Sequence, residues 1–251
     1  MEANVEGIRI NKYLSEAGIC SRREADRKVA AGEVHIDGVI AENGSKVSEG
    51  QTVTVNGKVV SGVQDAFVLI AFHKPRGVVC TTQKKDPDNI VDYIKYPVRI
   101  YPVGRLDKES TGLILLTNQG DLVNKMMRSG NAHEKEYLVT VNKDVTEEFL
   151  EGLANGVPIL DVVTRKCKVE KIGKRKFRMV LTQGLNRQIR RMCEYFGYRV
   201  VALKRVRIMN IRLGDLKEGT YRNVTKQELE VLMKLIEHSS NEPVRYEGDM
   251  K

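Results

Sequence analysis

A carboxylate and a guanidinium two residues apart stand near the centre of the sequence. Arg105 and Asp107 lie in the segment GRLDKESTG, which follows an apolar approach and precedes the apolar run 113–116. That run is too short for a buried helix and lacks polar alternation, which predicts a strand covered on both faces. A loop fixed between two buried strands would present this charged pair on a rigid mount. The alternative is that Asp107 caps a turn and Arg105 is its solvated neighbour, as for most loop carboxylates.

A second block of chemical interest, GLNRQIRRMCEYFGYRV, has the pattern of an amphipathic helix. Ile189, Met192, Cys193 and Phe196 recur at helical spacing, and Gly197 follows them. This spacing predicts a helix with one buried stripe that ends at the glycine.

Three arginines fall at the start of that predicted helix. Asn186 stands where an N-cap is expected, so Arg187, Arg190 and Arg191 decorate the first turns, beside the positive end of the helix dipole. Because three cations there destabilise an isolated helix, we expect an anion to compensate them. A carboxylate such as Asp107, or a phosphate, would do so.

The distribution of charge points to a polyanionic partner. The chain of 251 residues has a formal net charge of +9. Residues 1–64 carry eight basic and nine acidic side chains, whereas residues 165–212 carry sixteen basic and two acidic ones. A merely soluble surface would mix the signs, so the basic segment favours nucleic acid as the partner.

Other classes of protein find little support in the sequence. No apolar run approaches the ~18 residues that span a membrane, and the start has no pattern of an export signal. Four cysteines are scattered without a CxxC pair, and four histidines have no ligand spacing. We therefore expect a cytoplasmic protein with reduced thiols and no metal site.

The first sixty residues predict two short helices followed by β-hairpins. A helix over 8–18 ends at Gly18, and a capping box at Ser21 and Glu24 opens a second helix to about residue 31. Asp37-Gly38 and Asn56-Gly57 are typical of tight hairpin turns.

This pattern, with the string SRREADRKVAAGEVHIDG, resembles the S4 RNA-binding domain. The resemblance implies a domain over residues 1–63 in which Arg22, Arg23 and Arg27 contact phosphates or a minor groove. The alternative is an ordinary helix surface on which these arginines pair with Glu24 and Asp26.

The remainder predicts a larger domain over 67–238, after a linker at 61–66 and before a frayed tail at 239–251. A core strand begins at Phe67 and turns at Pro75 and Gly77. The next elements are predicted from their patterns as follows: a helix at 90–94, a helix from 120 to 129, a strand at 133–141, a helix at 146–156, a strand at 176–184, a basic strand region at 202–213, and a helix capped by Thr225 and Glu228 with Leu229, Leu232, Met233 and Ile236 buried.

The whole string GRLDKESTGLILLTN resembles the catalytic motif of RNA pseudouridine synthases of the RsuA/RluB/RluE/RluF family. The resemblance implies that Asp107 is catalytic and that Arg105 helps to hold the displaced nucleotide. The QIR block resembles a later motif of that family, whose arginine pairs with the catalytic aspartate, here Arg190. Tyr137, in the string KEYLV, matches the active-site tyrosine, although a core tyrosine on a strand is the alternative. His73 departs from the family, in which Asn is more usual in the opening motif, which we interpret as structural.

The resemblance also implies a fold, a reaction and partners. The expected fold class is α+β, with a small S4 domain and a larger synthase domain built on a mostly antiparallel mixed sheet with flanking helices. The expected reaction isomerises a uridine by base flipping, glycosidic bond cleavage and rejoining at C5, with no cofactor. The chain looks most like the RluF type, so the expected substrate is a stem-loop of 23S ribosomal RNA, with a tRNA anticodon arm as a second substrate. We expect a monomer, with RNA contacts from Arg187, Arg191, Lys204 and Arg205 in addition.

Two questions stay open from the sequence. Asp107 is compatible with attack on the base, attack on the sugar, or abstraction of a ribose proton. A non-catalytic ribosome-assembly or RNA-binding factor is the alternative function, and a nuclease is a weaker one because paired metal-binding carboxylates are missing.

Overall fold

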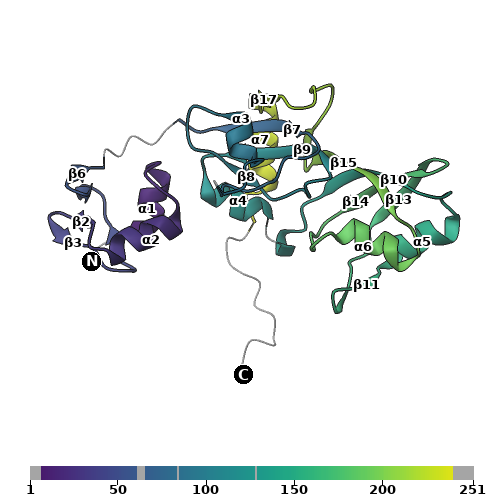
Figure 1. Ribbon diagram of the computed structural model, residues 1–251, viewed down its shortest axis with the longest axis horizontal. Coiled ribbons are helices and arrows are strands. Elements are labelled where there is room, and N and C mark those ends of the chain that lie inside the picture. Colours follow the sequence, from purple (N-terminus) through teal and green to yellow (C-terminus); the bar gives the residue numbers. More distant parts are fainter. Residues whose placement is uncertain (1–6, 61–65, 84, 128, 240–251) are drawn as a thin grey trace. The chain divides into compact units, whose positions relative to one another are not determined.

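The computed structural model describes residues 7–60, 66–83, 85–127 and 129–239 (Figure 1). Contacts divide the chain into two compact units, Met1–Phe67 with Pro97–Arg99, and Val68–Tyr96 with Ile100–Lys251. The predicted linker at 61–66 lies outside the described residues except for Ala66, and the predicted tail lies outside them except for Ser239. No helix in the described ranges is both long enough and apolar enough to cross a membrane.

The smaller unit packs two helices against short antiparallel strands. Helices α1 (Ile10–Glu16) and α2 (Arg22–Ala30) contribute buried Ile10, Leu14, Ala25 and Val29 to its core. Its four-stranded sheet has the order β3-β2-β5-β6, and β1 pairs with β4 outside that sheet. The strands are β1 (Ile8–Arg9), β2 (Val34–Ile36), β3 (Val39–Ile40), β4 (Lys46–Val47), β5 (Val53–Val55) and β6 (Lys58–Val59).

Both predicted hairpin turns form in this unit. Asp37 and Asn56 have φ of 50° and 49° and are followed by glycines with φ of 83° and 74°, as the two-residue turns require. The hydroxyl of Ser21 accepts a hydrogen bond from the Glu24 N–H at 3.1 Å. The Glu24 carboxylate, however, pairs with Arg27. An ion pair within α2 therefore takes the place of the second half of the predicted capping box.

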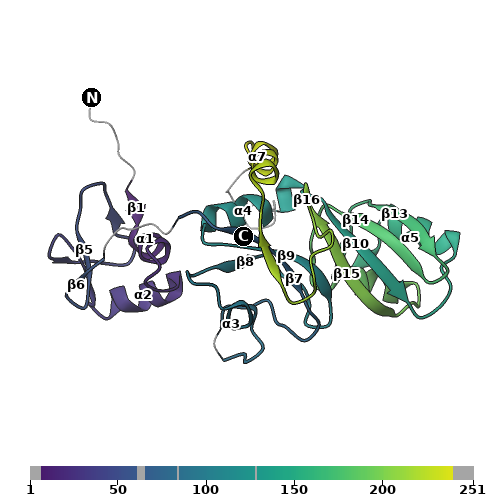
Figure 2. The ribbon, with the colours of Figure 1, turned by 90° about the horizontal axis from the view of Figure 1, so that it is seen from above.

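The larger unit is organised around one mixed sheet of nine strands (Figure 2). Its order is β13-β14-β10-β15-β9-β7-β17, with β16 paired to β15 and β8 paired to β9. All of these pairs are antiparallel except β15 with β9, which confirms the predicted sheet. The strands are β7 (Leu69–Lys74), β8 (Tyr101–Val103), β9 (Thr111–Thr117), β10 (Lys135–Val141), β13 (Lys168–Gly173), β14 (Lys176–Leu181), β15 (Val200–Ile208), β16 (Ile211–Arg212) and β17 (Tyr221–Asn223). A separate pair joins β11 (Pro158–Ile159) to β12 (Val162–Val163).

Helices cover both faces of the β7–β9 half of the sheet. Helices α4 (Gly120–Met127) and α7 (Lys226–Leu235) pack on one face, and α3 (Ile90–Ile94) lies on the other (Figure 2). Alternate residues of β7 face the two layers: Ala71 joins the cluster of α4 and α7, whereas the ring of Phe72 lies 5.8 Å from that of Tyr93 in α3. This burial on both faces explains the continuous apolar run predicted for β9.

Helices α5 (Glu147–Asn155) and α6 (Gln188–Tyr195) belong to the other half of the sheet, with β10, β13 and β14 (Figure 1). Phe149 of α5 packs edge-on against Phe177 of β14, with ring centroids 5.7 Å apart. Three members of the stripe predicted for α6 are buried, namely Ile189, Met192 and Cys193, whereas the fourth, Phe196, is the C-cap and is half-buried. A short 3-10 helix, Ser129–Asn131, follows α4.

Two details of the predicted helices are wrong. Helix α6 begins at Gln188, and its N-cap is Arg187, with φ of 50° and no side-chain cap, not Asn186. On α7 the predicted capping box forms between Thr225 and Glu228, but Met233 is 49% exposed. The helix turns Met233 out of the core that Leu232 enters, because adjacent helical residues lie about 100° apart around the axis.

The two halves of the sheet meet at the parallel pair, where the backbones of Gly112 and Arg205 are paired. Gly112 has φ of +108°, and a Cβ there would lie 2.2 Å from the carbonyl oxygen of Arg205. Only glycine allows this approach. The segment that carries Asp107 enters β9 at this junction.

Candidate active site

Hydrogen bonds that involve its backbone atoms hold the loop that presents Asp107. The N–H of Ser110 donates to the Asp107 carbonyl oxygen at 3.0 Å, and the N–H of Gly77 donates to the Lys108 carbonyl oxygen at 2.8 Å. The N–H of Leu106 donates to the Sγ of buried Cys80 at 3.4 Å. Hydrogen bonds within the loop and from the segment that follows β7 therefore hold the loop that carries the carboxylate.

A buried lysine on β7 also supports this loop. Lys74 is 0% exposed, and its Nζ donates to the carbonyl oxygens of Pro75 at 2.8 Å, Val78 at 2.7 Å and Lys108 at 3.4 Å. Burial lowers the pKa of Lys74. All three acceptors of Lys74 are backbone carbonyl oxygens, which supports the interpretation of the opening motif as structural.

The structure brings Asp107 and Arg190 together. The Nε of Arg190 donates to the Oδ2 of Asp107 at 3.3 Å, and its Nη2 donates to the Oγ of Ser110 at 3.2 Å. The side chain of Arg190 is 11% exposed and that of Asp107 is 28% exposed. The guanidinium of Arg190, held by hydrogen bonds on two sides, fixes the position of the Asp107 carboxylate and leaves part of it open to a ligand.

A second carboxylate shares the same arginines. Glu109 lies 3.5 Å from Arg187 Nη1 and 3.9 Å from Arg190 Nη2, and Arg187 Nη1 also lies 3.9 Å from Asp107. The side chains of Arg187 and Glu109 are 43% and 51% exposed. The expected anion near the start of α6 is therefore a pair of carboxylates, of which only Asp107 is substantially enclosed.

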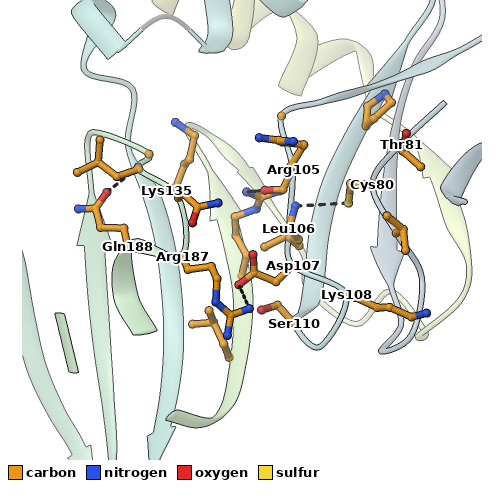
Figure 3. Close-up of a pocket in the computed structure, with 18 of the residues that line it drawn as sticks. Cys80, Thr81, Arg105, Leu106, Asp107, Lys108, Ser110, Lys135, Arg187 and Gln188 are labelled. Atoms are coloured by element: carbon orange, nitrogen blue, oxygen red, sulfur yellow. Dashed lines mark hydrogen bonds and ion pairs between the residues drawn. The ribbon is translucent and has the colours of Figure 1, made fainter. Parts of the chain in front are cut away.

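These side chains border a cavity of about 1030 Å³, part of which Figure 3 draws. Asp107, Arg190 and Tyr137 all line it. Tyr137 is 9% exposed, and its hydroxyl has no hydrogen-bond partner among the described residues. An aromatic ring on β10 and an accessible carboxylate thus face the same space, which is large enough for a nucleotide.

The other predicted RNA contacts near this cavity fall into two groups. Arg105 and Arg187 line the cavity and are exposed enough to meet a ligand. Arg191 is not among the lining residues, and its guanidinium donates to the carbonyl and side-chain oxygens of Asn186 at 3.1 and 3.4 Å. Arg191 therefore supports the loop before α6.

The placement of two residues on β15 does not fit the predicted contacts with RNA. Arg205 is 2% exposed, with its Nε donating to the Leu113 carbonyl at 2.7 Å and its Nη1 to the Arg105 carbonyl at 3.5 Å. Its guanidinium supports the Asp107 loop and is not presented at the surface. Lys204 lies between Leu203 and Arg205, which both line the cavity, so strand alternation directs Lys204 to the opposite face of the sheet. The basic run carries no information about the face of the sheet, and the RNA contacts of both residues remain predictions.

The three arginines predicted in the smaller unit are all exposed. The side chain of Arg27 is 75% exposed and pairs with Glu24, as the alternative interpretation proposed. Among the described residues, no hydrogen bond or ion pair involves the side chains of Arg22 and Arg23. These two are the cations of the S4-like helix with free guanidinium groups.

Three polar residues in or beside the cavity were not singled out in the sequence. Ser110 and Glu109 stand within the segment GRLDKESTG and contact the arginines described above, and Ser110 lines the cavity. Lys135 is 7% exposed and lines the cavity. It stands two residues before Tyr137 on a strand, and this period of two was the available signal that both side chains share a face.

The geometry permits covalent or acid–base chemistry on a bound base. A carboxylate held by a guanidinium can attack as a nucleophile or accept a proton, and the aromatic ring can stack on a planar ligand. No group of three or more His, Cys, Asp or Glu side chains in the described ranges is placed to hold a metal ion.

Comparisons with known proteins agree with this geometry. Residues 68–195 match the family model of the RNA pseudouridylate synthases, and residues 8–53 match the S4 domain. The chain is 57% identical over 235 residues to the dual-specificity RNA pseudouridine synthase RluF of Salmonella typhi, covering 93% of this chain and 81% of that protein. Its identity to the protein of the same name from Escherichia coli (strain K12) is 56% over 236 residues, covering 94% and 81%.

More distant relatives share the same organisation. The chain is 35% identical to the ribosomal large subunit pseudouridine synthase B of Bacillus subtilis, covering 93% of this chain and 98% of that protein. A crystal structure of a pseudouridylate synthase, 28% identical, superposes with a TM-score of 0.67 over 90% of this chain and 99% of that one.

Proposed function

The chain belongs to the family of RNA pseudouridine synthases with an S4 domain, and we propose that it isomerises a specific uridine in a stem-loop of 23S ribosomal RNA, with a tRNA anticodon arm as a second substrate. The family establishes the activity, that of an RNA pseudouridine synthase. The substrates and the roles of individual residues are our proposal.

One observation carries the assignment of roles. Asp107, its partner Arg190, and Tyr137 come from three separate elements, the loop before β9, helix α6 and strand β10, and line one cavity. A binding surface has no need of a partly accessible carboxylate among cations, because RNA phosphates would be repelled by it. A catalytic site for a flipped nucleotide does need one.

In the proposed reaction the target uridine leaves its stack and enters the cavity, at a cost of a few kcal/mol. Tyr137 stacks on the uracil, and a contact of this kind contributes about 1–3 kcal/mol. Arg105 and Arg187 hold the sugar–phosphate chain on either side of the displaced nucleotide. Arg190 is hydrogen-bonded to the Asp107 carboxylate and aims it at that nucleotide.

The chemical change is an exchange of bonds within one nucleotide. The bond between C1′ of the ribose and N1 of the uracil breaks, and a bond between C1′ and C5 forms. The hydrogen on C5 leaves as a proton, and N1 gains one, so the reaction needs no oxidant or reductant. Asp107 starts it by attack on the sugar, by attack on the base, or by removal of a ribose proton.

The proposed substrates rest on the relatives and on the smaller unit. The two RluF proteins are named dual-specificity enzymes, and the B. subtilis relative is named for the large ribosomal subunit. We propose that residues 1–63 bind RNA through Arg22 and Arg23, that residues 67–238 carry out catalysis, and that the enzyme works as a monomer. We place it in the cytoplasm, whose reducing conditions suit four free cysteines.

Release of tritium from RNA labelled at C5 of uracil tests the activity directly. The wild-type protein should release tritium from a 23S ribosomal RNA fragment, and Asp107→Ala should release none. Release from a tRNA anticodon arm would establish the second substrate. If the wild type bound ribosomal RNA but released no tritium from any fragment, the alternative of a non-catalytic assembly factor would replace this proposal.

A further inference from the structure

Two cations that line the cavity form no ion pair with a carboxylate among the described residues. Lys135 on β10 and Arg205 on β15 are 7% and 2% exposed, and both line the cavity. The Nζ of Lys135 donates to the His133 carbonyl oxygen at 3.2 Å. The Nη2 of Arg205 is buried and has no hydrogen-bond partner among the described residues. Figure 3 shows the Lys135 side chain apart from Asp107 and Ser110.

The acids closest in sequence to Lys135 are paired elsewhere. Glu134 and Glu136 flank it on the chain, so strand alternation directs their side chains to the other face of the sheet. There they pair with Arg207 at 2.9 and 2.8 Å. No carboxylate in the described part of the chain forms an ion pair with Lys135, so the balancing negative charge must come from outside the protein.

A buried cation without a counter-ion lowers the stability of the folded protein. Such a residue is therefore a candidate for binding an anionic ligand. Burial, with a smaller contribution from Arg205, lowers the pKa of Lys135 to about 8. An ammonium group has three donors, and the His133 carbonyl takes one of them. The ordinary structural alternative is that Lys135 packs its aliphatic stem on the sheet and places its head in the cavity for hydration. In that case methionine would serve equally well.

We propose that Lys135, assisted by the charge of Arg205, binds a backbone phosphate of the RNA adjacent to the flipped uridine, and thereby positions that nucleotide over Asp107 and Tyr137. The inference rests on the proposed function, because it is the flipped nucleotide that brings RNA into the cavity. A phosphate is the anion that RNA offers on either side of every nucleotide, and its charge-assisted hydrogen bonds would satisfy the remaining donors of Lys135.

The charge state of Lys135 makes the proposal testable through pH. The charged groups facing it are Arg205 from β15 and Arg105 from the Asp107 loop, while the paired position of β14 is Leu181. Arginines keep their proton throughout the range from pH 7 to 9. Burial raises the pKa of the Cys80 thiol above 9.0, and burial lowers the pKa of the His133 ring below 6.5. Bound phosphate stabilises the ammonium form, so binding takes up a proton once the pH exceeds about 8, and affinity falls.

The first experiment measures the dissociation constant of the stem-loop RNA between pH 7 and 9. Lys135→Met should weaken binding about tenfold to a hundredfold at pH 7, the loss expected for a hydrogen bond to a charged group. Wild type should lose affinity from pH 8 upward, whereas Lys135→Arg should bind with no such loss because its guanidinium stays charged. Lys234→Met, an exposed lysine of α7, is the matched control and should behave as wild type. If Lys135→Met bound the RNA as tightly as wild type and with the same pH profile, the proposal would be overturned. The role of Lys135 would then be the packing of its aliphatic chain on the sheet.

The second experiment identifies the anion. A neutral methylphosphonate replaces the phosphate on the 5′ side, and separately on the 3′ side, of the target uridine. One of the two should weaken wild-type binding and have little further effect on Lys135→Met. If each methylphosphonate weakened binding to Lys135→Met as much as it weakened binding to wild type, Lys135 would contact neither phosphate. That result would overturn the proposal and indicate a contact with a uracil carbonyl.

Tritium release separates the two levels of inference. Lys135→Met should raise KM more than it lowers kcat, because the residue positions RNA and does not react. Release by wild type with an unchanged KM for Lys135→Met would overturn this inference alone. Absence of release by wild type would overturn the proposed function itself.

Discussion

The two units of the chain place their cations in opposite ways. In the smaller unit Arg22, Arg23 and Arg27 stand exposed on one helix. In the larger unit Arg190 and Lys135 are 9% and 7% exposed and hydrogen-bonded within a cavity. Exposed cations attract a polyanion over a distance and are screened by salt. Enclosed cations have fixed positions and bind only a ligand that enters the cavity. The first unit is therefore suited to capture RNA and the second to position one nucleotide.

The backbones of the two units differ in the same sense. Gly57 in the smaller unit has φ of +74° and open space around a Cβ built on it, whereas Gly112 has φ of +108° and lies against the Arg205 backbone. The turn in the smaller unit requires only the positive φ of Gly57. The junction in the larger unit requires both a positive φ and close packing, because the strand that follows the Asp107 loop lies against β15 there.

The largest expected effect comes from this pair of glycines. Gly112→Ala combines an unfavourable positive φ with a backbone collision, so it should lower the free energy of unfolding by about 3 kcal/mol or more. Gly57→Ala carries only the conformational cost, about 1 kcal/mol. Urea unfolding with hydrogen–deuterium exchange, which assigns each transition to its unit, checks both. Equal destabilisation by the two substitutions would show that the junction is not tightly packed.

The second effect concerns activity. Arg190→Ala leaves Asp107 without its hydrogen-bonded cation and Ser110 without its partner, so kcat/KM should fall on the order of a hundredfold, the scale of a misplaced catalytic group. Arg27→Ala removes only an exposed ion pair and should leave kcat at saturating RNA unchanged. Tritium release, measured for both variants at limiting and at saturating RNA, provides the comparison. A similar loss of kcat in the two variants would erase the distinction between capture and positioning.

The third effect concerns salt. Replacing Arg22 and Arg23 together with alanine should reduce the slope of log affinity against log salt concentration by about 2, one for each phosphate contact. Binding titrations from low to moderate KCl measure this slope, and kcat serves as the control. An unchanged slope would remove these two arginines from the RNA surface.

The smallest effect concerns Glu109. Its carboxylate competes with phosphate for Arg187, but the pair is half exposed, so removal of the charge should change RNA affinity by no more than about 1 kcal/mol. Glu109→Gln should therefore bind RNA up to about fivefold more tightly, most clearly at low salt. Weaker binding by this variant would mean that Glu109 itself contacts the RNA.

Local signals in the sequence predicted most of the elements. The Asp-Gly and Asn-Gly turns, the cap at Thr225 and the apolar run of β9 all appear as expected, because each depends on a few neighbouring residues. The start of α6 was misplaced at Asn186. Its Arg187 adopts φ of 50° without a side-chain cap, and its guanidinium lies near Glu109 and Asp107, which are distant in the sequence.

The site was predictable only in part, for the same reason. Asp107, Tyr137 and Arg190 were recognised through motifs. The burial of Arg205 and the placement of Lys204 on the opposite face of the sheet depend on how β15 pairs with β9 and β10, which the basic run does not encode. That Lys135 forms no ion pair with a carboxylate of the described residues likewise depends on the sheet face that Glu134 and Glu136 occupy.

The most direct test of the account compares turnover and RNA affinity in Asp107→Asn. Asparagine preserves the shape of the side chain and can still face Arg190, but it cannot act as a carboxylate nucleophile or base. We expect tritium release to be abolished while the dissociation constant of the stem-loop RNA stays within about threefold of wild type, less than the effect of one hydrogen bond to a charged group. Retained turnover, or a loss of affinity as large as the loss of turnover, would contradict the claim that Asp107 is the reacting group of this cavity.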